Sequence, residues 1–215
     1  MVTDRKFART LHACLFFAAL GATVVGLAPP SWPWYLLLPM LAYAGVVLAI
    51  PLLRRTAPRL KIGRTGGPPL TCAIVLAITT SAVLVAFHLL ARPNIAELAT
   101  KLPPSLFGSV ILAGVVFSLV NAAMEELVFR GLLWAIVAEE WNERIALVLT
   151  SLMFGVLHLH GYPPGPLGAV LAGLYGFALG FLRRWTGGIG LALACHVFAD
   201  ATVFGLLNST SVFEL

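Results

Sequence analysis

Three short motifs place ionisable side chains within long apolar stretches of the sequence. In chain order they are Glu125-Glu126-x-x-x-Arg130, Phe154-x-x-x-His158 and His196-x-x-x-Asp200. A charged side chain costs at least about 2.5 to 3.5 kcal/mol at the centre of a membrane helix, so it needs a partner or a function. A carboxylate and two imidazoles around one cavity can activate water: the carboxylate takes its proton, one imidazole orients it, and the remaining donors stabilise an oxyanion. This is chemistry that hydrolyses peptides.

The same residue types support two other kinds of chemistry. Glu125, His158 and His196 can hold a divalent metal such as zinc, with the reacting water bound to the metal. A buried carboxylate beside histidines can also carry protons through a transporter. The inverted-repeat hydropathy of many transporters is not visible in this sequence. The motifs therefore favour hydrolysis, either through a metal or through the side chains alone.

The spacing within the first motif places its two carboxylates on different faces of a helix, with different neighbours. Glu126 and Arg130 are four residues apart and can pair on one face of a helix, so we interpret this pair as structural. Glu125 projects about 100° away, onto the stripe that carries Asn121. The Asn121 amide either donates to the Glu125 carboxylate or forms a hydrogen bond between helices.

The composition of the chain identifies the elements that must position these residues. Of its 215 residues, 60% are hydrophobic and only 11% are charged, and the mean hydropathy is +0.95. A soluble domain carries about 25% charged residues. Because unpaired backbone groups are too costly in hydrocarbon, and because the apolar runs do not alternate, the spanning segments must be helices. We therefore predict an all-α, polytopic transmembrane helical bundle.

About seven spans, within a range of six to eight, follow from the apolar runs. They cover residues 11–28, 34–53, 70–91, 105–138, 145–160, 166–182 and 187–207. The fourth run has 34 residues and would be about 51 Å long as one helix, so it must tilt, break or protrude from the membrane. We predict three N-terminal spans in residues 1–104, a catalytic core of four spans in residues 105–207 and a tail at 208–215, folded as one domain.

The basic residues between the spans predict the orientation of the bundle. Eleven fall in the loops on one side: Arg5, Lys6, Arg9, Arg54, Arg55, Arg59, Lys61, Arg64, Arg144, Arg183 and Arg184. Only Arg92 and Lys101 fall on the other side. Lys and Arg collect on the cytoplasmic side of membrane proteins, so the split predicts a cytoplasmic N-terminus. The net charge of +5 is explained in this way, and we predict no nucleic-acid partner.

Distances along the predicted spans place the key residues at one depth. Counted from the cytoplasmic ends of their segments, Glu125, His158 and His196 lie 12 to 14 residues into the membrane. At 1.5 Å per residue, this is a depth of about 18 to 21 Å on three separate helices. The three side chains can therefore converge on one buried site.

The three motifs, in this order and on separate apolar segments, resemble the signature of the CPBP intramembrane proteases, the family of CAAX-processing and bacteriocin-processing enzymes. The resemblance covers about residues 105–207. It implies that Glu125 is the general base, that His158 is its partner in activating water, and that His196 and Asp200 stabilise the oxyanion. Glu126, Arg130 and Phe154 are then supporting residues.

The sequence departs from the CAAX-type members at Asp200, because those members usually close the third motif with Asn. An ionised Asp cannot donate to an oxyanion. Asp200 is therefore either protonated in its apolar setting, or orients His196, or binds a metal.

The resemblance implies an intramembrane endopeptidase that cuts near the terminus of membrane-anchored, lipidated or sorting-signal-bearing proteins. The alternative is a non-catalytic immunity or peptide-sequestering membrane protein of the same family. The compact chain resembles a bacterial member, so we expect an integral protein of a bacterial inner membrane. Its expected partners are membrane lipid and a protein or peptide substrate within the membrane.

Overall fold

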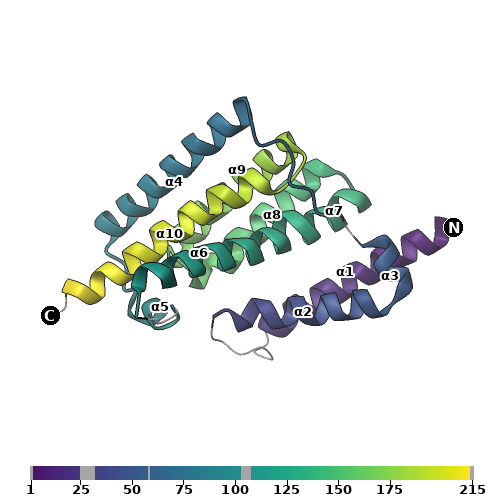
Figure 1. Cartoon of the computed structure of the whole chain (residues 1–215), viewed down its shortest axis with the longest axis horizontal. Helices are drawn as coiled ribbons and strands as arrows, with labels where there is room; N and C mark the ends of the chain where they lie inside the picture. Colours follow the sequence, from purple (N-terminus) through teal and green to yellow (C-terminus); the bar gives the residue numbers. More distant parts are fainter. Residues whose placement is uncertain (1, 25–31, 58, 103–107, 214–215) are drawn as a thin grey trace.

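Long apolar runs with few charges form the helices of this chain. The computed structural model describes residues 2–24, 32–57, 59–102 and 108–213, and all regular secondary structure in these ranges is helical (Figure 1). This agrees with the predicted all-α class. The elements are α1 (Val2–Val24), α2 (Trp34–Ala49), α3 (Pro51–Thr56), α4 (Pro68–Ala91), α5 (Ala96–Thr100), α6 (Val110–Glu126), the π-helix η1 (Leu127–Leu133), α7 (Trp134–Glu140), α8 (Glu143–Leu157), the 3₁₀ turn η2 (His158–His160), α9 (Gly165–Thr186) and α10 (Gly190–Phe213).

Five helical segments of the described chain are long and apolar enough to cross a membrane. They are α4, the continuous segment Val110–Glu140, α8 with η2, α9, and α10. The first two helices contain shorter apolar stretches, Thr10–Ala19 in α1 and Leu37–Ala49 in α2. The predicted total of seven spans therefore stays a prediction for this N-terminal part. At the other end, α10 continues past the predicted boundary at residue 207.

The long fourth segment remains helical throughout but changes its winding in the middle. α6, η1 and α7 follow one another without a break, and η1 is a seven-residue π-helix that begins directly after Glu126 and contains Arg130. In a π-helix each N–H bonds five residues back, which widens the turn, and such segments are frequent at functional sites. The first chemical motif thus lies at the junction between an α-helix and a π-helix.

Residues without bulky side chains allow α8 and α9 to pack closely. A Cβ atom added to Gly155 of α8 would lie only 2.7 Å from the Ala169 carbonyl oxygen of α9. One added to Gly176 of α9 would lie 3.2 Å from both Phe154 and Arg130. Small residues at such a crossing let membrane helices approach each other. α10 packs on α6 and α4, and Figure 1 shows α4 on the flank of the bundle.

The N-terminal helices form a separate flank. α1 and α2 lie side by side along one edge of the molecule (Figure 1), and Phe16 and Tyr43 join a buried cluster with Val128 of η1 and Trp134 of α7. The buried His12 ties this flank together, because its Nδ1 is 2.8 Å from the Tyr43 hydroxyl and its Nε2 is 3.1 Å from the carbonyl oxygen of Leu53. We interpret His12 as structural.

A backbone clasp fixes the basic loop after α3 against the turn between α9 and α10. The Ile189 and Gly190 amides donate to the carbonyl oxygens of Lys61 and Ile62, at 2.8 and 2.9 Å. Gly63 has φ +80°, and a Cβ there would lie 2.6 Å from the backbone nitrogen of Gly188. The clasp gathers the basic residues around Lys61 at the same end of the bundle as Arg183 and Arg184, which lie in the last turn of α9.

Candidate active site

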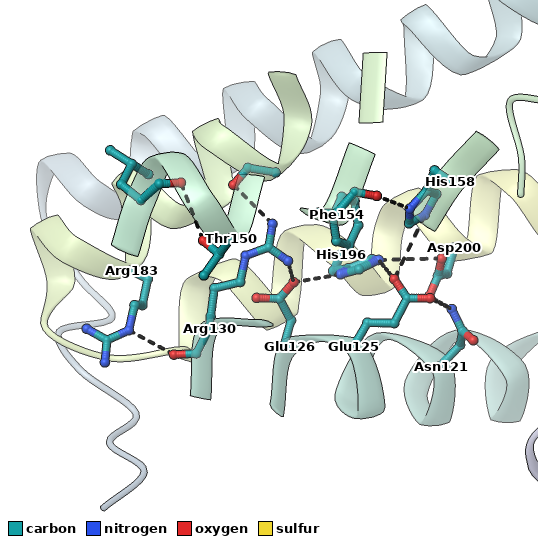
Figure 2. A network of polar contacts seen from close by, with 12 residues as sticks. Asn121, Glu125, Glu126, Arg130, Thr150, Phe154, His158, Arg183, His196 and Asp200 are labelled. Atoms are coloured by element: carbon teal, nitrogen blue, oxygen red, sulfur yellow. Dashed lines mark hydrogen bonds and ion pairs between the residues drawn. The ribbon is translucent and has the colours of Figure 1, made fainter. Parts of the chain in front are cut away.

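Three helices bring the key residues of the motifs together. Glu125 lies on α6, His158 follows α8, and His196 and Asp200 lie one turn apart on α10 (Figure 2). Glu125 Oε2 is 3.6 Å from His196 Nε2 and 3.9 Å from His158 Nε2. His196 Nε2 is also 3.8 Å from Asp200 Oδ1. The convergence predicted from equal depths is therefore present in the structure.

The hydrogen bonds of the two histidines orient their rings. His158 Nδ1 lies 2.8 Å from the Phe154 carbonyl oxygen, and His196 Nδ1 lies 2.7 Å from Glu126 Oε1. A carbonyl and a carboxylate oxygen can only accept, so both Nδ1 atoms carry a proton and donate. In a neutral imidazole, Nε2 then keeps its lone pair. Both lone pairs are on the side of the ring that faces Glu125.

The supporting residues of the first motif form a fully buried network behind the site. Arg130 donates from NH1 to Glu126 Oε1 at 2.7 Å and from NH2 to the Gly176 carbonyl oxygen at 3.0 Å. Neither Glu126 nor Arg130 is exposed. The structure therefore shows the predicted ion pair. It adds that Glu126 also accepts the proton of His196 Nδ1, so the pair positions an imidazole of the site.

Phe154 packs between the network and the site. Its ring centroid is 4.2 Å from that of His158 and 5.7 Å from that of His196. The Arg130 guanidinium lies 4.6 Å above the same ring, at a distance typical of a cation–π contact. Phe154 thus supports both histidines by packing, as expected for a residue one helical turn before His158.

Asn121 contributes more to the site than the sequence indicates. Its Nδ2 donates to Glu125 Oε1 at 3.0 Å and to Asp200 Oδ2 at 3.2 Å, so one amide bridges the two carboxylates. Both interpretations of this residue therefore hold, since it bonds within α6 and also across to α10. The hydroxyl of Tyr35, on α2, lies 3.4 Å from Asn121 Oδ1. Nothing in the sequence around Tyr35 indicated this contact.

For the peptide hydrolysis predicted from the motifs, we expect Asn121→Ala to lower the catalytic efficiency by about ten- to a hundredfold, because loss of a partner for a buried polar group costs about 1 to 3 kcal/mol. Here one donor serves two carboxylates. The matched control is Asn208→Ala, which removes an amide that donates to the Phe204 carbonyl oxygen within α10. Cleavage rates of the two purified variants provide the measurement. Equal rates in both variants contradict a role for Asn121 in the site.

Two cavities meet at the candidate site residues. The first, of about 350 Å³, is lined by Asn121, Glu125, His158 and Asp200 at its inner end and by exposed Lys101 and His160 at its mouth. The second, of about 300 Å³, lies among α4, α9 and α10 and is lined mainly by apolar side chains. Four residues form a wall common to both cavities: His158, Tyr162, Asp200 and Val203.

The two tyrosines in the wall of the second cavity differ in their hydrogen bonding. The Tyr162 hydroxyl lies 3.0 Å from His88 Nδ1, and burial raises the pKa of Tyr162 to about 12. The Tyr175 hydroxyl is buried but has no hydrogen-bond partner in the described protein. The ring of Tyr175 packs edge-on against that of His196, with centroids 5.9 Å apart. Tyr175 is thus a donor beside the site that the sequence motifs do not include.

The metal prediction for Glu125, His158 and His196 is not decided by the geometry. Within residues 2–24, 32–57, 59–102 and 108–213, no group of three or more His, Cys, Asp and Glu side chains is arranged to hold a metal ion. The outer hydrogen bonds of both imidazoles suit metal ligands and metal-free catalysts alike. Zinc binding therefore stays a prediction, and elemental analysis of the purified protein checks it.

Comparison with protein families identifies the segment that carries the site. Residues 106–202 match the family described as type II CAAX prenyl endopeptidase Rce1-like. Comparisons with curated proteins and with solved structures gave no match. The family match confirms the resemblance that the three motifs predict. All residues of the three motifs lie within the matched range.

Proposed function

Because residues 106–202 are of the CAAX prenyl endopeptidase type, we propose that this protein is an intramembrane endopeptidase in which Glu125 and His158 activate water. Its substrates are membrane-anchored, lipidated or sorting-signal-bearing proteins, cut near a terminus. The observation that carries the proposal is Glu125 Oε2, a buried oxygen that accepts no hydrogen bond from the described residues and faces the Nε2 atoms of two histidines. A buried acceptor of this kind costs about 1 to 3 kcal/mol when it is left unpaired.

The proposed reaction begins with a water that donates to Glu125 Oε2 and to His158 Nε2. Glu125 takes one proton as the water oxygen attacks the carbonyl carbon of the substrate, and a tetrahedral oxyanion forms. The C–N bond then breaks, and Glu125 returns its proton to the leaving nitrogen. The products are a carboxylic acid and an amine, and Glu125 is again ionised. Asn121 and Glu126 of α6 bond to Asp200 and His196 of α10, and these bonds hold the two helices in register.

The oxyanion needs donors, and Asp200 cannot supply one while it is ionised. His196 Nε2 donates only when the ring is an imidazolium, because Nδ1 already gives its proton to Glu126. The Tyr175 hydroxyl is a donor in either case; Tyr175 lines the second cavity, and its ring packs against that of His196. We therefore assign Tyr175 to the oxyanion as a partner of His196, and Asp200 to orienting His196 and Asn121.

We expect Tyr175→Phe to lower kcat by about ten- to a hundredfold while KM changes little, because the hydroxyl acts on charge that develops in the transition state. The ring, and with it the packing on His196, is retained. The matched control is Tyr43→Phe, which removes a buried hydroxyl that bonds His12 far from the site. Steady-state kinetics separate kcat from KM. A change confined to KM contradicts the assignment.

The proposal includes the setting of the enzyme. Five apolar helices of the described chain and the protease family indicate an integral membrane protein. We further propose a bacterial inner membrane with the N-terminus in the cytoplasm, on the distribution of Lys and Arg. We keep the division into N-terminal helices at 1–104, a protease core at 105–207 and a tail at 208–215, folded as one domain.

The test compares the termini of membrane and secreted proteins in cells that carry the wild type and cells that carry Glu125→Gln at matched expression. A discrete set of proteins should keep an extra terminal segment only in the Glu125→Gln cells. Glu143→Gln is the matched control, since Glu143 is exposed and pairs with Arg184. If Glu125→Gln leaves every terminus unchanged while deletion of the gene has a phenotype, the protein acts without catalysis, as an immunity or peptide-sequestering protein.

A further inference from the structure

The two ends of the helical bundle differ in charge. The described basic residues of the loops and helix ends gather at one end: Arg54, Arg55, Arg59, Lys61, Arg64, Arg144, Arg183 and Arg184. The clasp of Lys61 and Ile62 on Ile189 and Gly190, together with the Arg184–Glu143 pair at 3.2 Å, shows that these loops lie together. Only Arg92 and Lys101 lie at the opposite end of the described chain. The positive-inside rule makes the basic end cytoplasmic.

The cavity that contains Glu125 opens at the other end. Its mouth is formed by the α5 region with Leu98 and Lys101, by the start of α2, and by the turn at His160 and Gly161 that follows α8. Lys101 and His160 are exposed there. None of the eight cytoplasmic basic residues named above lines this cavity. The polar route from solvent to Glu125 therefore starts at the non-cytoplasmic end.

The length of α8 explains why the site is reached from that end. α8 starts beside the cytoplasmic basic residues at Glu143 and has only 15 residues, or about 22 Å. It ends at Leu157, so His158 stands at its non-cytoplasmic terminus, and the chain turns back at Gly161. A catalytic histidine at a helix terminus is thus separated from the cavity mouth by a single turn, whereas the full length of α8 separates it from the cytoplasm.

We propose that the active site receives its substrate from the non-cytoplasmic side of the membrane. The inference rests on the proposed protease function and names its substrate class: exported proteins that stay attached to the membrane and are cut beside their anchor, on the outer side. The peptide chain enters through the mouth at Lys101. The apolar cavity, which opens among α4, α9 and α10 and shares His158 and Asp200 with the first, accommodates the anchor-proximal apolar residues.

Cysteine labelling tests the direction of access. Lys101→Cys places a thiol at the mouth, and Arg59→Cys places a matched thiol at an exposed position of the basic end, both in a Cys14→Ala/Cys72→Ala background that keeps buried Cys195. The probe is a maleimide on a large polyethylene glycol chain, which cannot cross the membrane. It is added to spheroplasts, to permeabilised cells and to the detergent-solubilised protein. Processing of the proteins identified in the terminus comparison is followed in parallel.

We expect Lys101→Cys to react in intact spheroplasts and Arg59→Cys only after permeabilisation. Modification of the thiol in the Lys101→Cys variant should lower the rate of substrate processing at least tenfold. Modification of the thiol in the Arg59→Cys variant should leave this rate unchanged. The opposite labelling pattern overturns the proposal, and so does full processing after Lys101→Cys is modified from outside. The protease assignment fails separately, through full processing in Glu125→Gln cells, and that result leaves the labelling pattern as it is.

Discussion

Replacing Glu125 with Gln is expected to lower the rate of peptide cleavage by about 10²- to 10⁴-fold, the range over which a positioned general base contributes to catalysis. Gln keeps the volume of the side chain, and its amide oxygen can still accept the hydrogen bond from the Asn121 amide. The fold should therefore persist. What is lost is the carboxylate that takes the proton of the attacking water. Single-turnover rates with a processed substrate, beside the thermal unfolding midpoint of each variant, provide the measurement.

The same experiment extends to His158 through a double variant. His158→Asn should cause a loss of similar size, because His158 Nε2 and Glu125 Oε2 face one reacting water in the proposed mechanism. Residues that act as one unit give strongly non-additive losses. The double variant should therefore be little slower than the slower single variant. Losses that multiply would show that the two residues act independently, and the shared-water mechanism would be wrong.

Arg130→Met is expected to destabilise the protein by about 3 to 5 kcal/mol, because it leaves a buried carboxylate without its cation. Arg130 is completely buried, and it also donates to the Gly176 carbonyl. Its removal therefore loosens the contact between η1 and α9 as well as the support of His196 through Glu126. The measurement is the free energy of unfolding, or the shift in Tm, of the protein in one detergent.

The exposed Arg184 offers a matched control for this variant. Arg184→Met breaks an ion pair with Glu143 at 3.2 Å at the surface, and such pairs contribute about 0 to 1 kcal/mol. Adding Glu126→Gln to Arg130→Met removes the unpaired charge and should recover part of the stability. If Arg130→Met unfolds no earlier than Arg184→Met, the network is not structural and the interpretation of this pair has to be abandoned.

Much of the architecture could be predicted because the membrane constrains it. Hydrocarbon tolerates few charges and no unpaired backbone, so composition alone leads to the all-α class. The same cost makes Glu125, His158 and His196 conspicuous, and counting residues from the loops predicts that they meet. The i, i+4 spacing likewise predicts the pair of Glu126 and Arg130, which the structure shows at 2.7 Å.

Contacts between distant helices could not be predicted in the same way. The sequence pairs Glu126 with Arg130 but does not show that Glu126 also holds His196, because this depends on how α6 faces α10. The sequence predicts a hydrogen bond of Asn121 to Glu125 or to another helix, yet its bridge to Asp200 requires the same packing. Tyr175 carries no motif signal, since aromatic residues are common in apolar helices. The π-helix after Glu126 also has no signature in the residue pattern that we could use.

The wall that the two cavities share has a consequence for the reaction medium. On one side is a polar cavity with a solvent-exposed mouth, and on the other is an apolar space among helices that face lipid. Peptide hydrolysis in a membrane needs one reagent that partitions into water and one that partitions into hydrocarbon. Organic chemists solve this problem with a biphasic reactor, in which reaction occurs only where the liquids touch. In this protein a polar and an apolar cavity share a wall, and His158 and Asp200 are part of it.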